Sequence, residues 1–216
     1  MGTPAHWQEA QEALSASCPV MRRLISLAGE AYLEPRGDPY QTLARSIVGQ
    51  QISVKAAASV WSRFEQHCKG KPEPAKVARM QLSSLRACGL SERKAEYLRD
   101  LSCRFVDGSL KPQAWVQWDD EAVIASLIQV RGIGRWTAEM FLIFNLLRPD
   151  VWPLDDLGLL RAAGIHWSED PQQAWKDRKV KASRSEAIAI GERFRPWRSV
   201  ATWYLWRSLD PVPVSY

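Results

Sequence analysis

The sequence has few of the residues that form metal centres or disulfides. Only four cysteines and three histidines occur among its 216 residues, and no two cysteines stand in a CxxC pair. Because this spacing fits no common zinc or iron–sulfur pattern, a metal role is disfavoured. We interpret all four cysteines as small buried apolar residues. They are Cys18, Cys68, Cys88 and Cys103.

Long apolar runs and β-type alternation are also missing. No stretch approaches the roughly 18 consecutive apolar residues of a membrane span, so we expect no membrane partner. The N-terminal residues lack the basic-then-apolar order of a secretory signal. An intracellular protein is therefore expected, in the cytoplasm (the bacterial nucleoid) or in a nucleus. Helical apolar stripes preceded by Asp38, Ser53 and Ser91 as capping residues predict an all-α fold.

Positive charge and tryptophan are both plentiful. The net charge is +5, which favours a polyanionic partner because binding releases counterions from phosphates. Five of the eleven tryptophans fall in the last fifty residues. They form either a tryptophan-rich core or an aromatic surface that stacks on bases. Residues 178–184 hold four basic side chains, for which a solvated charged face and a phosphate contact are both open.

The most informative segment is residues 127–141, LIQVRGIGRWTAEMF. One apolar helix is predicted to end there and another to begin, with Gly132 and Gly134 in the turn. Glycine permits positive φ and lets a ligand approach the backbone closely. Amides at the start of a helix form an anion site that suits a phosphate. Ile133 between the glycines is expected to tuck into the helix pair and fix the hairpin.

VRGIGRWTA resembles the helix-hairpin-helix signature of the base-excision DNA glycosylase superfamily, L-P-G-[IV]-G-x-x-T-A, with Arg131 where the family often carries proline. The segments ARSIVGQQISVKAAASVWSRF, CGLSERKAEYL, WPLDDLGL and RFRPWRSVATWYLW are similar to helices of the DNA-3-methyladenine glycosylase II branch. The resemblance covers about residues 39–206. It implies an all-α, two-lobed helix-hairpin-helix glycosylase fold with the active site in the interlobe cleft.

The same resemblance predicts the domain organisation. We expect a single glycosylase domain over residues 1–216, in the compact form without an N-terminal β-domain. One lobe is predicted over about residues 39–154, including the hairpin at 127–141. The other lobe is predicted to combine residues 1–38 with residues 155–216.

Alignment of LDDLGL with the family pattern makes Asp156 the catalytic carboxylate. Cleavage of an N-glycosidic bond develops positive charge on the sugar, as in glycoside hydrolysis. A fixed carboxylate stabilises that charge and helps to orient or deprotonate the attacking water. The alternative is that both aspartates merely cap a helix, and we expect Asp155 to do mainly that.

The resemblance also identifies a base pocket. Trp136 stands where lyase-type relatives carry a lysine, and an indole cannot form an imine, so base release without strand cleavage is expected. Trp136 and Trp206 are the main pocket candidates, with Met140 and Leu157 at positions where relatives can carry aromatics. Aromatic faces attract the cationic ring of an alkylated purine. Core packing is the alternative for Trp136.

Contacts to DNA are expected at the hairpin and at one further loop. The predicted set is Gln50, Gln51, Gly132, Ile133, Gly134, Arg135 and Thr137. Gln51 is chosen as the wedge that fills the space left by a flipped base, and an exposed polar pair is the equal alternative. Relatives hold a sodium or potassium ion through main-chain carbonyls, here those of Ile128, Val130 and Ile133. No cofactor is otherwise required, and no iron–sulfur cluster is expected because no cysteine follows Cys103.

The predicted function is that of a monofunctional DNA glycosylase. It would hydrolyse the N-glycosidic bond of alkylated purines, of the 3-methyladenine and 7-methylguanine type, in double-stranded DNA and so initiate base excision repair. A monomer is expected, with damaged duplex DNA as its partner. Two alternatives remain open at this point: a non-catalytic DNA-binding module with the same hairpin, and a glycosylase for mismatched or oxidised bases.

Overall fold

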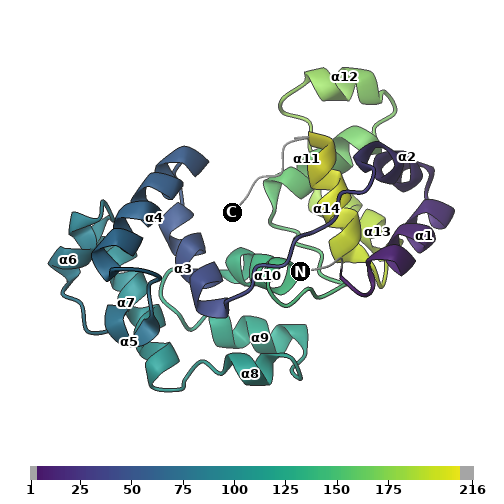
Figure 1. The fold of residues 1–216 in the computed structure, drawn as a ribbon. Coiled ribbons are helices and arrows are strands. Elements are labelled where there is room, and N and C mark those ends of the chain that lie inside the picture. Colours follow the sequence, from purple (N-terminus) through teal and green to yellow (C-terminus); the bar gives the residue numbers. More distant parts are fainter. Residues whose placement is uncertain (1–3, 210–216) are drawn as a thin grey trace. The chain divides into compact units, whose positions relative to one another are not determined.

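The computed structural model describes residues 4–209, which form fourteen helices and no strand (Figure 1). The all-α prediction is therefore confirmed. The chain divides into two compact units, residues 36–141 (the middle unit) and residues 4–35 with 142–209 (the terminal unit). None of the described helices is long and apolar enough to cross a membrane.

The middle unit is built from short and medium helices around α7. Its helices are α3 (Pro39–Gly49), α4 (Val54–Cys68), α5 (Pro74–Val77), α6 (Leu82–Ala87), α7 (Glu92–Val106), α8 (Pro112–Trp115), α9 (Asp120–Leu127) and the start of α10 (Arg135–Phe144). Helix α7 packs against α3, α5 and α6, while α3 also packs on α4 (Figure 1). Edge-to-face rings from Tyr40, Phe105, Trp115 and Phe141 fill the core.

Capping side chains start these helices where the sequence predicts them. Asp38 accepts the Gln41 amide at the start of α3, with Pro39 in the first helical position. Ser53 and Ser91 accept the third amides of α4 and α7 in the same way. Each cap satisfies an amide that has no partner within its own helix, so the helix starts are fixed locally.

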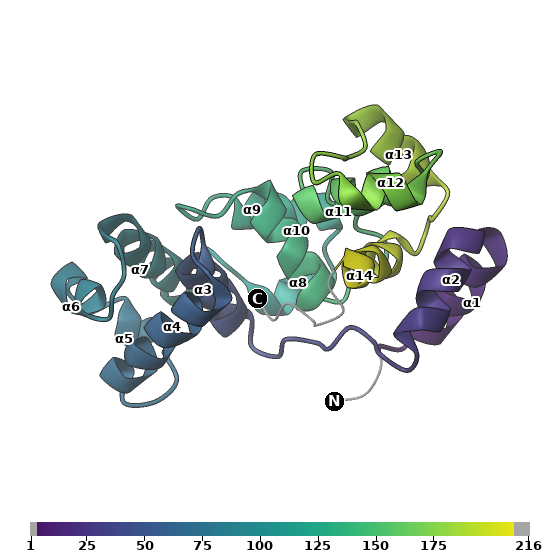
Figure 2. The same ribbon diagram turned by 90° about the horizontal axis from the view of Figure 1, so that it is seen from above.

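The terminal unit combines both ends of the described chain. Its helices are α1 (Trp7–Ser17), α2 (Pro19–Ala28), α11 (Leu157–His166), α12 (Pro171–Lys176), α13 (Arg184–Glu192) and α14 (Arg198–Leu209), together with the end of α10. Helix α14 packs against α1, α2 and α11, and α1 and α2 form an adjacent pair (Figure 2). Trp7, Trp203 and Tyr204 interlock at its centre, which explains part of the tryptophan content by core packing.

The boundary between the units differs from the predicted position after Leu154. It falls inside α10, between Phe141 and Leu142. Two contacts with α14 hold the end of the segment 142–154 in the terminal unit. Asp150 pairs with Arg198 at 2.7 Å, and the Val151 amide donates to the Ser199 Oγ at 2.9 Å.

The expectation that all four cysteines are buried is wrong at one position. Cys18, Cys68 and Cys88 are buried, and burial raises the pKa of the Cys68 thiol to about 11. Cys103 is exposed because it lies on the solvent side of α7, away from the buried stripe of Ala95, Leu98 and Leu101.

Candidate active site

Asp156 is a buried carboxylate that accepts hydrogen bonds from two helices. It is the N-cap of α11, and its Oδ1 accepts the Leu159 amide at 2.6 Å. The same oxygen accepts the indole Nε1 of Trp206 from α14 at 2.7 Å. Only 8% of Asp156 is exposed. A carboxylate at a helix N-terminus is stabilised by the backbone amides and the helix dipole, so this position supplies a fixed negative charge.

Trp206, which donates to this carboxylate, also stacks on a second aromatic ring. Its ring lies parallel to that of Phe144, with centroids 5.8 Å apart and an interplanar angle of 9°. Gly158 makes room for the pair. A Cβ at Gly158 would lie 3.1 Å from Asp156 Oδ1 and 3.1 Å from Trp206 Cδ1, tighter than ordinary contacts. The site thus combines a carboxylate, a flat aromatic face and a neighbouring residue without a side chain.

Asp155 does not cap α11, contrary to the expectation. The N-cap is Asp156, and Asp155 is exposed and pairs with Arg184 at 2.7 Å. Asp156 takes the capping position because its own backbone is extended there while α11 begins at Leu157. Capping and catalysis are therefore not alternatives for Asp156, since one oxygen of the carboxylate serves as the cap. The side chain of Leu157 itself is 71% exposed.

In the middle unit, the two glycines of the hairpin turn differ. Gly132 has φ +82, and a Cβ there would overlap the Tyr97 ring, so both conformation and packing require glycine. Gly134 has no such φ, and a Cβ there would meet nothing within 4 Å. Open space above a backbone at the start of α10 is what a phosphate needs for close approach. Ile133 is 4% exposed, which is the burial expected of a residue that fixes the hairpin.

The first turns of α10 carry the remaining hairpin candidates. Arg135 pairs with Glu121, and its Nε also donates to Glu139 Oε1 at 3.0 Å. Contact with a phosphate would therefore have to compete with two carboxylates. Trp136 is half-buried, whereas Thr137 and Met140 are buried at 7% and 8% exposure.

The loop between α3 and α4 places its two glutamines differently. Gln50 donates through Nε2 to the Gly132 carbonyl at 2.8 Å, which ties the loop to the hairpin turn. Gln51 is exposed and has φ +57, a conformation that side-chain-bearing residues rarely adopt. Of the two, Gln51 is thus the side chain presented to solvent.

The carbonyls of the hairpin were predicted to hold a monovalent cation. Val130 O accepts the Ile133 amide at 3.1 Å, which leaves its second lone pair for a further partner. Ile128 follows the last residue of α9 in the helical conformation, where carbonyls have no partner within the helix. Across residues 4–209, no group of three or more His, Cys, Asp and Glu side chains is arranged to hold a metal.

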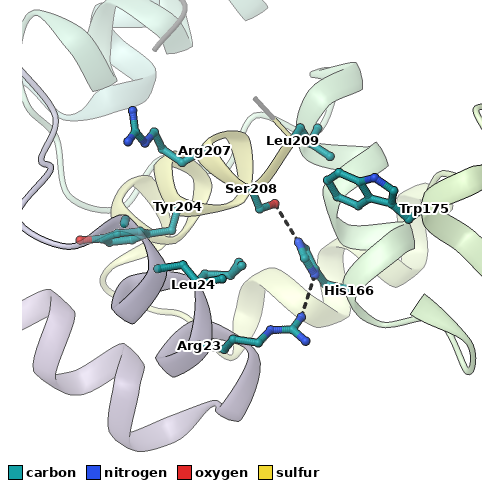
Figure 3. A pocket seen from close by; sticks show the side chains of 10 residues that line it. Arg23, Leu24, His166, Trp175, Tyr204, Arg207, Ser208 and Leu209 are labelled. Carbon is teal, nitrogen blue, oxygen red and sulfur yellow. Dashed lines mark hydrogen bonds between the residues drawn. The ribbon is translucent and has the colours of Figure 1, made fainter. Parts of the chain in front are cut away.

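A cavity of about 540 Å³ lies elsewhere in the terminal unit, between α2, α11, α12 and α14 (Figure 3). Arg23 donates to His166 Nδ1 at 3.2 Å, and because arginine only donates, His166 Nε2–H must donate to Ser208 Oγ at 2.7 Å. Burial, and then the charge of Arg23, lowers the pKa of His166 to about 4. No predicted site residue lines this cavity.

Comparison with known proteins decides the family. A family model described as "HhH-GPD superfamily base excision DNA repair protein" matches residues 44–188. The chain belongs to the HhH-GPD superfamily. A member from Schizosaccharomyces pombe named DNA-3-methyladenine glycosylase 1 is 34% identical over 194 residues, which is 87% of this chain and 81% of that protein.

Solved structures of HhH-GPD proteins agree with this fold. A DNA-3-methyladenine glycosidase from Bacillus halodurans has a TM-score of 0.82 at 31% identity, covering 97% of this chain and 93% of that chain. A 3-methyladenine DNA glycosylase from Schizosaccharomyces pombe, in complex with abasic DNA, has a TM-score of 0.79 at 30% identity, covering 95% and 99%. The predicted helix-hairpin-helix glycosylase fold is therefore confirmed.

Sequence reasoning missed two residues beside Asp156 in the terminal unit and one residue beside the hairpin in the middle unit. Phe144 lies beyond the signature, and its ring contact with Trp206 reveals it. Gly158 lies two residues after the N-cap of α11 and has no positive φ, so its backbone conformation does not require glycine. A glycine at such a position in a helix is a signal of close packing. Lys94 lies in the first turn of α7, where cations are disfavoured, which signals a partner on another element.

Proposed function

We propose that this protein is a monofunctional DNA glycosylase that removes alkylated purines from double-stranded DNA as the first step of base excision repair. The observation that carries the proposal is the buried Asp156 carboxylate, held by the Leu159 amide and the Trp206 indole beside an aromatic stack. The names of the similar proteins, DNA-3-methyladenine glycosylases, support the same substrate class.

The chemistry follows from the charge that develops on the sugar. As the N-glycosidic bond breaks, the sugar acquires oxocarbenium-like positive charge. Asp156 would face this charge in an orientation that the hydrogen bonds from Leu159 and Trp206 help to fix, so the carboxylate would not have to reorganise during the reaction. The same group can orient the attacking water and accept its proton.

Alkylated purines fit this site because they are good leaving groups. A base such as 3-methyladenine already carries positive charge on its nucleoside and leaves without being protonated. The electron-rich face of Trp206 in the terminal unit would bind such a cationic ring, at about 0.5–2 kcal/mol. Trp136 in the middle unit is a separate candidate for the same kind of contact. Since Trp136 has no amine, a Schiff base with the sugar is not available there, and the strand is left intact.

DNA binding is proposed at the hairpin turn and the loop between α3 and α4. Gly134 with its open surroundings, and the amides at the start of α10, would take a phosphate. The exposed Gln51 would fill the space of the flipped base. A sodium or potassium ion held by the carbonyls of Ile128, Val130 and Ile133 would add positive charge next to this phosphate. We propose that the enzyme acts as a monomer, in the cytoplasm or the nucleus.

The test is base release from methylated duplex DNA by wild type, Asp156→Asn and the control Asp155→Asn. Asparagine still caps α11 through its side-chain oxygen, so the fold should be retained. We expect Asp156→Asn to lose about 10²–10⁴-fold in rate and Asp155→Asn to stay near wild type. Strand breaks should appear only after alkali. Binding without release of any base would instead indicate a plain DNA-binding module.

A further inference from the structure

Lys94 occupies an electrostatically unfavourable place in the middle unit. It is the third residue of α7, and its amide donates to the N-cap Ser91. The N-terminus of a helix carries the positive end of the dipole, so anionic side chains are favoured there. Lys94 is also half-buried, and burial lowers the pKa of its ammonium group. A cation in this position requires partners on another element.

Those partners are two carbonyls at the C-terminal end of α3, one in its last turn and one on the C-cap residue. The Nζ of Lys94 donates to Val48 O at 2.8 Å and to Gln50 O at 2.7 Å. The final carbonyls of a helix lack partners within the helix and lie at the negative end of its dipole, so an ammonium group satisfies both needs. Lys94 thereby caps α3 from the side and fixes the direction in which the chain leaves it. Gln51, with its φ of +57, follows directly.

The same face of α7 also holds the hairpin turn. The Tyr97 ring occupies the space that a side chain at position 132 would need, and Asp100 Oδ2 accepts the Arg131 amide at 2.8 Å. Lys94, Tyr97 and Asp100 follow at intervals of three residues, which places them on one side of the helix. The Gln50 side chain closes the arrangement by donating to Gly132 O at 2.8 Å.

We propose that this face of α7 fixes the position of the loop at residues 49–53 relative to the hairpin turn at residues 131–134. Lys94 is the positioning residue that sets the loop in the conformation needed to enter the duplex. The inference rests on the proposed function, in which both segments contact DNA. Lys94 touches neither base nor sugar and acts through the backbone of Gln50 and Gln51. Without its ammonium group the α3 carbonyls would bind water, and the loop would have to be ordered during base extrusion.

The kinetic test compares a paired with an unpaired lesion. Lys94→Met keeps the length of the side chain but removes its donors, and Arg93→Met removes the neighbouring exposed charge on the same helix. Single-turnover excision is measured for one alkylated base in a matched duplex and in a bubble, where it is already unstacked. We expect Lys94→Met to be slowed about tenfold or more on the duplex and less than about twofold in the bubble. Arg93→Met should stay within about twofold on both.

Three kinetic results would overturn the proposal. Equal slowing of Lys94→Met on both substrates would place its effect in the chemistry or in overall stability. Equal slowing of Lys94→Met and Arg93→Met on the duplex would indicate that the loss of one positive charge, and not the loss of the Lys94 hydrogen bonds, causes the effect. Wild-type rates for Lys94→Met on both substrates would show that Lys94 has no role in excision.

Amide hydrogen exchange of the free protein makes the inference separable from the proposed function. Lys94→Met should exchange faster at residues 49–53 and 131–134 and at wild-type rates elsewhere. Gln50→Leu, a half-exposed position, should loosen the turn in the same way and serves if Lys94→Met does not fold. If wild type releases no base, the proposed function fails. Hydrogen exchange would still test whether Lys94 holds the loop against the hairpin turn. Unchanged exchange in both variants would overturn it.

Discussion

The indole Nε1 of Trp206 donates to Asp156 Oδ1 over 2.7 Å, joining residues fifty positions apart in the sequence. The same oxygen accepts the Leu159 amide, so α14 and the first turn of α11 hold the carboxylate together. Trp206 therefore has two separable properties, a hydrogen-bond donor that orients the carboxylate and a ring that stacks on Phe144.

The donor can be removed while a ring is kept. In Trp206→Phe, Asp156 loses the indole donor, and a hydrogen bond to a charged group contributes about 1.5–3 kcal/mol. We expect a fall of about tenfold or more in the single-turnover rate, with DNA affinity near that of wild type. Trp175→Phe, at an exposed tryptophan of the same unit, is the control. An unchanged rate in Trp206→Phe would mean that the carboxylate is oriented without the indole.

Gly158→Ala should act on the same hydrogen bond from the other side. The added methyl group would lie 3.1 Å from both Asp156 Oδ1 and Trp206 Cδ1, so one of them must move by a few tenths of an ångström. Gly158 has no positive φ, and alanine is the better helix former. We therefore expect lower base release without loss of thermal stability. Activity and melting temperature measured on one preparation decide this, and full activity would contradict it.

Gly132 and Gly134 should respond differently to alanine. Gly132→Ala introduces a strained φ and overlap with Tyr97, so it should destabilise the protein by about 1–3 kcal/mol. Gly134→Ala meets neither obstacle and should fold like wild type, but its methyl group would occupy the space proposed for a phosphate. Denaturant unfolding and DNA binding measured for both variants test this. Wild-type DNA binding by Gly134→Ala would show that no phosphate binds over Gly134.

His166 should make the stability of the protein depend on pH. Its pKa falls from the ordinary 6.5 to about 4 in the folded protein, so between these values the unfolded chain binds more protons. The contribution of His166 to stability should decrease as pH falls from about 6.5 to about 4 and change no further below that. Arg23 from α2 and Ser208 from α14 face the ring.

The variant His166→Gln isolates this effect. Its amide can accept from Arg23 and donate to Ser208, and it does not titrate. Melting temperatures of wild type and variant should run parallel above pH 7 and diverge toward pH 4, with wild type losing more. Parallel curves over the whole range would show that protonation of His166 does not contribute.

Local signals in the sequence predicted most of the architecture. Capping residues such as Asp38, Ser53 and Ser91 act within four residues of themselves, so the sequence alone locates their helices. The hairpin was equally readable, because Gly132 is required by its own backbone conformation. The choice of Asp156 over Asp155 as the candidate catalytic residue came from the family resemblance and stays a prediction.

Contacts between distant residues could not be predicted in this way. Which of two adjacent aspartates caps α11 depends on the φ and ψ of each, and these are set by packing of the whole unit. The Trp206 donor comes from another helix, and so does the ammonium group of Lys94 beneath the end of α3. Such contacts depend on how helices pack, which the order of residues along one helix does not determine.

The uneven burial of the cysteines makes the natural chain suitable for selective labelling. Cys18, Cys68 and Cys88 are buried, and burial raises the pKa of the Cys68 and Cys88 thiols, which disfavours the reactive thiolate. Cys103 is exposed on α7. A thiol-reactive fluorophore should therefore attach at this one position without mutagenesis and place a spectroscopic reporter on the helix that carries Lys94.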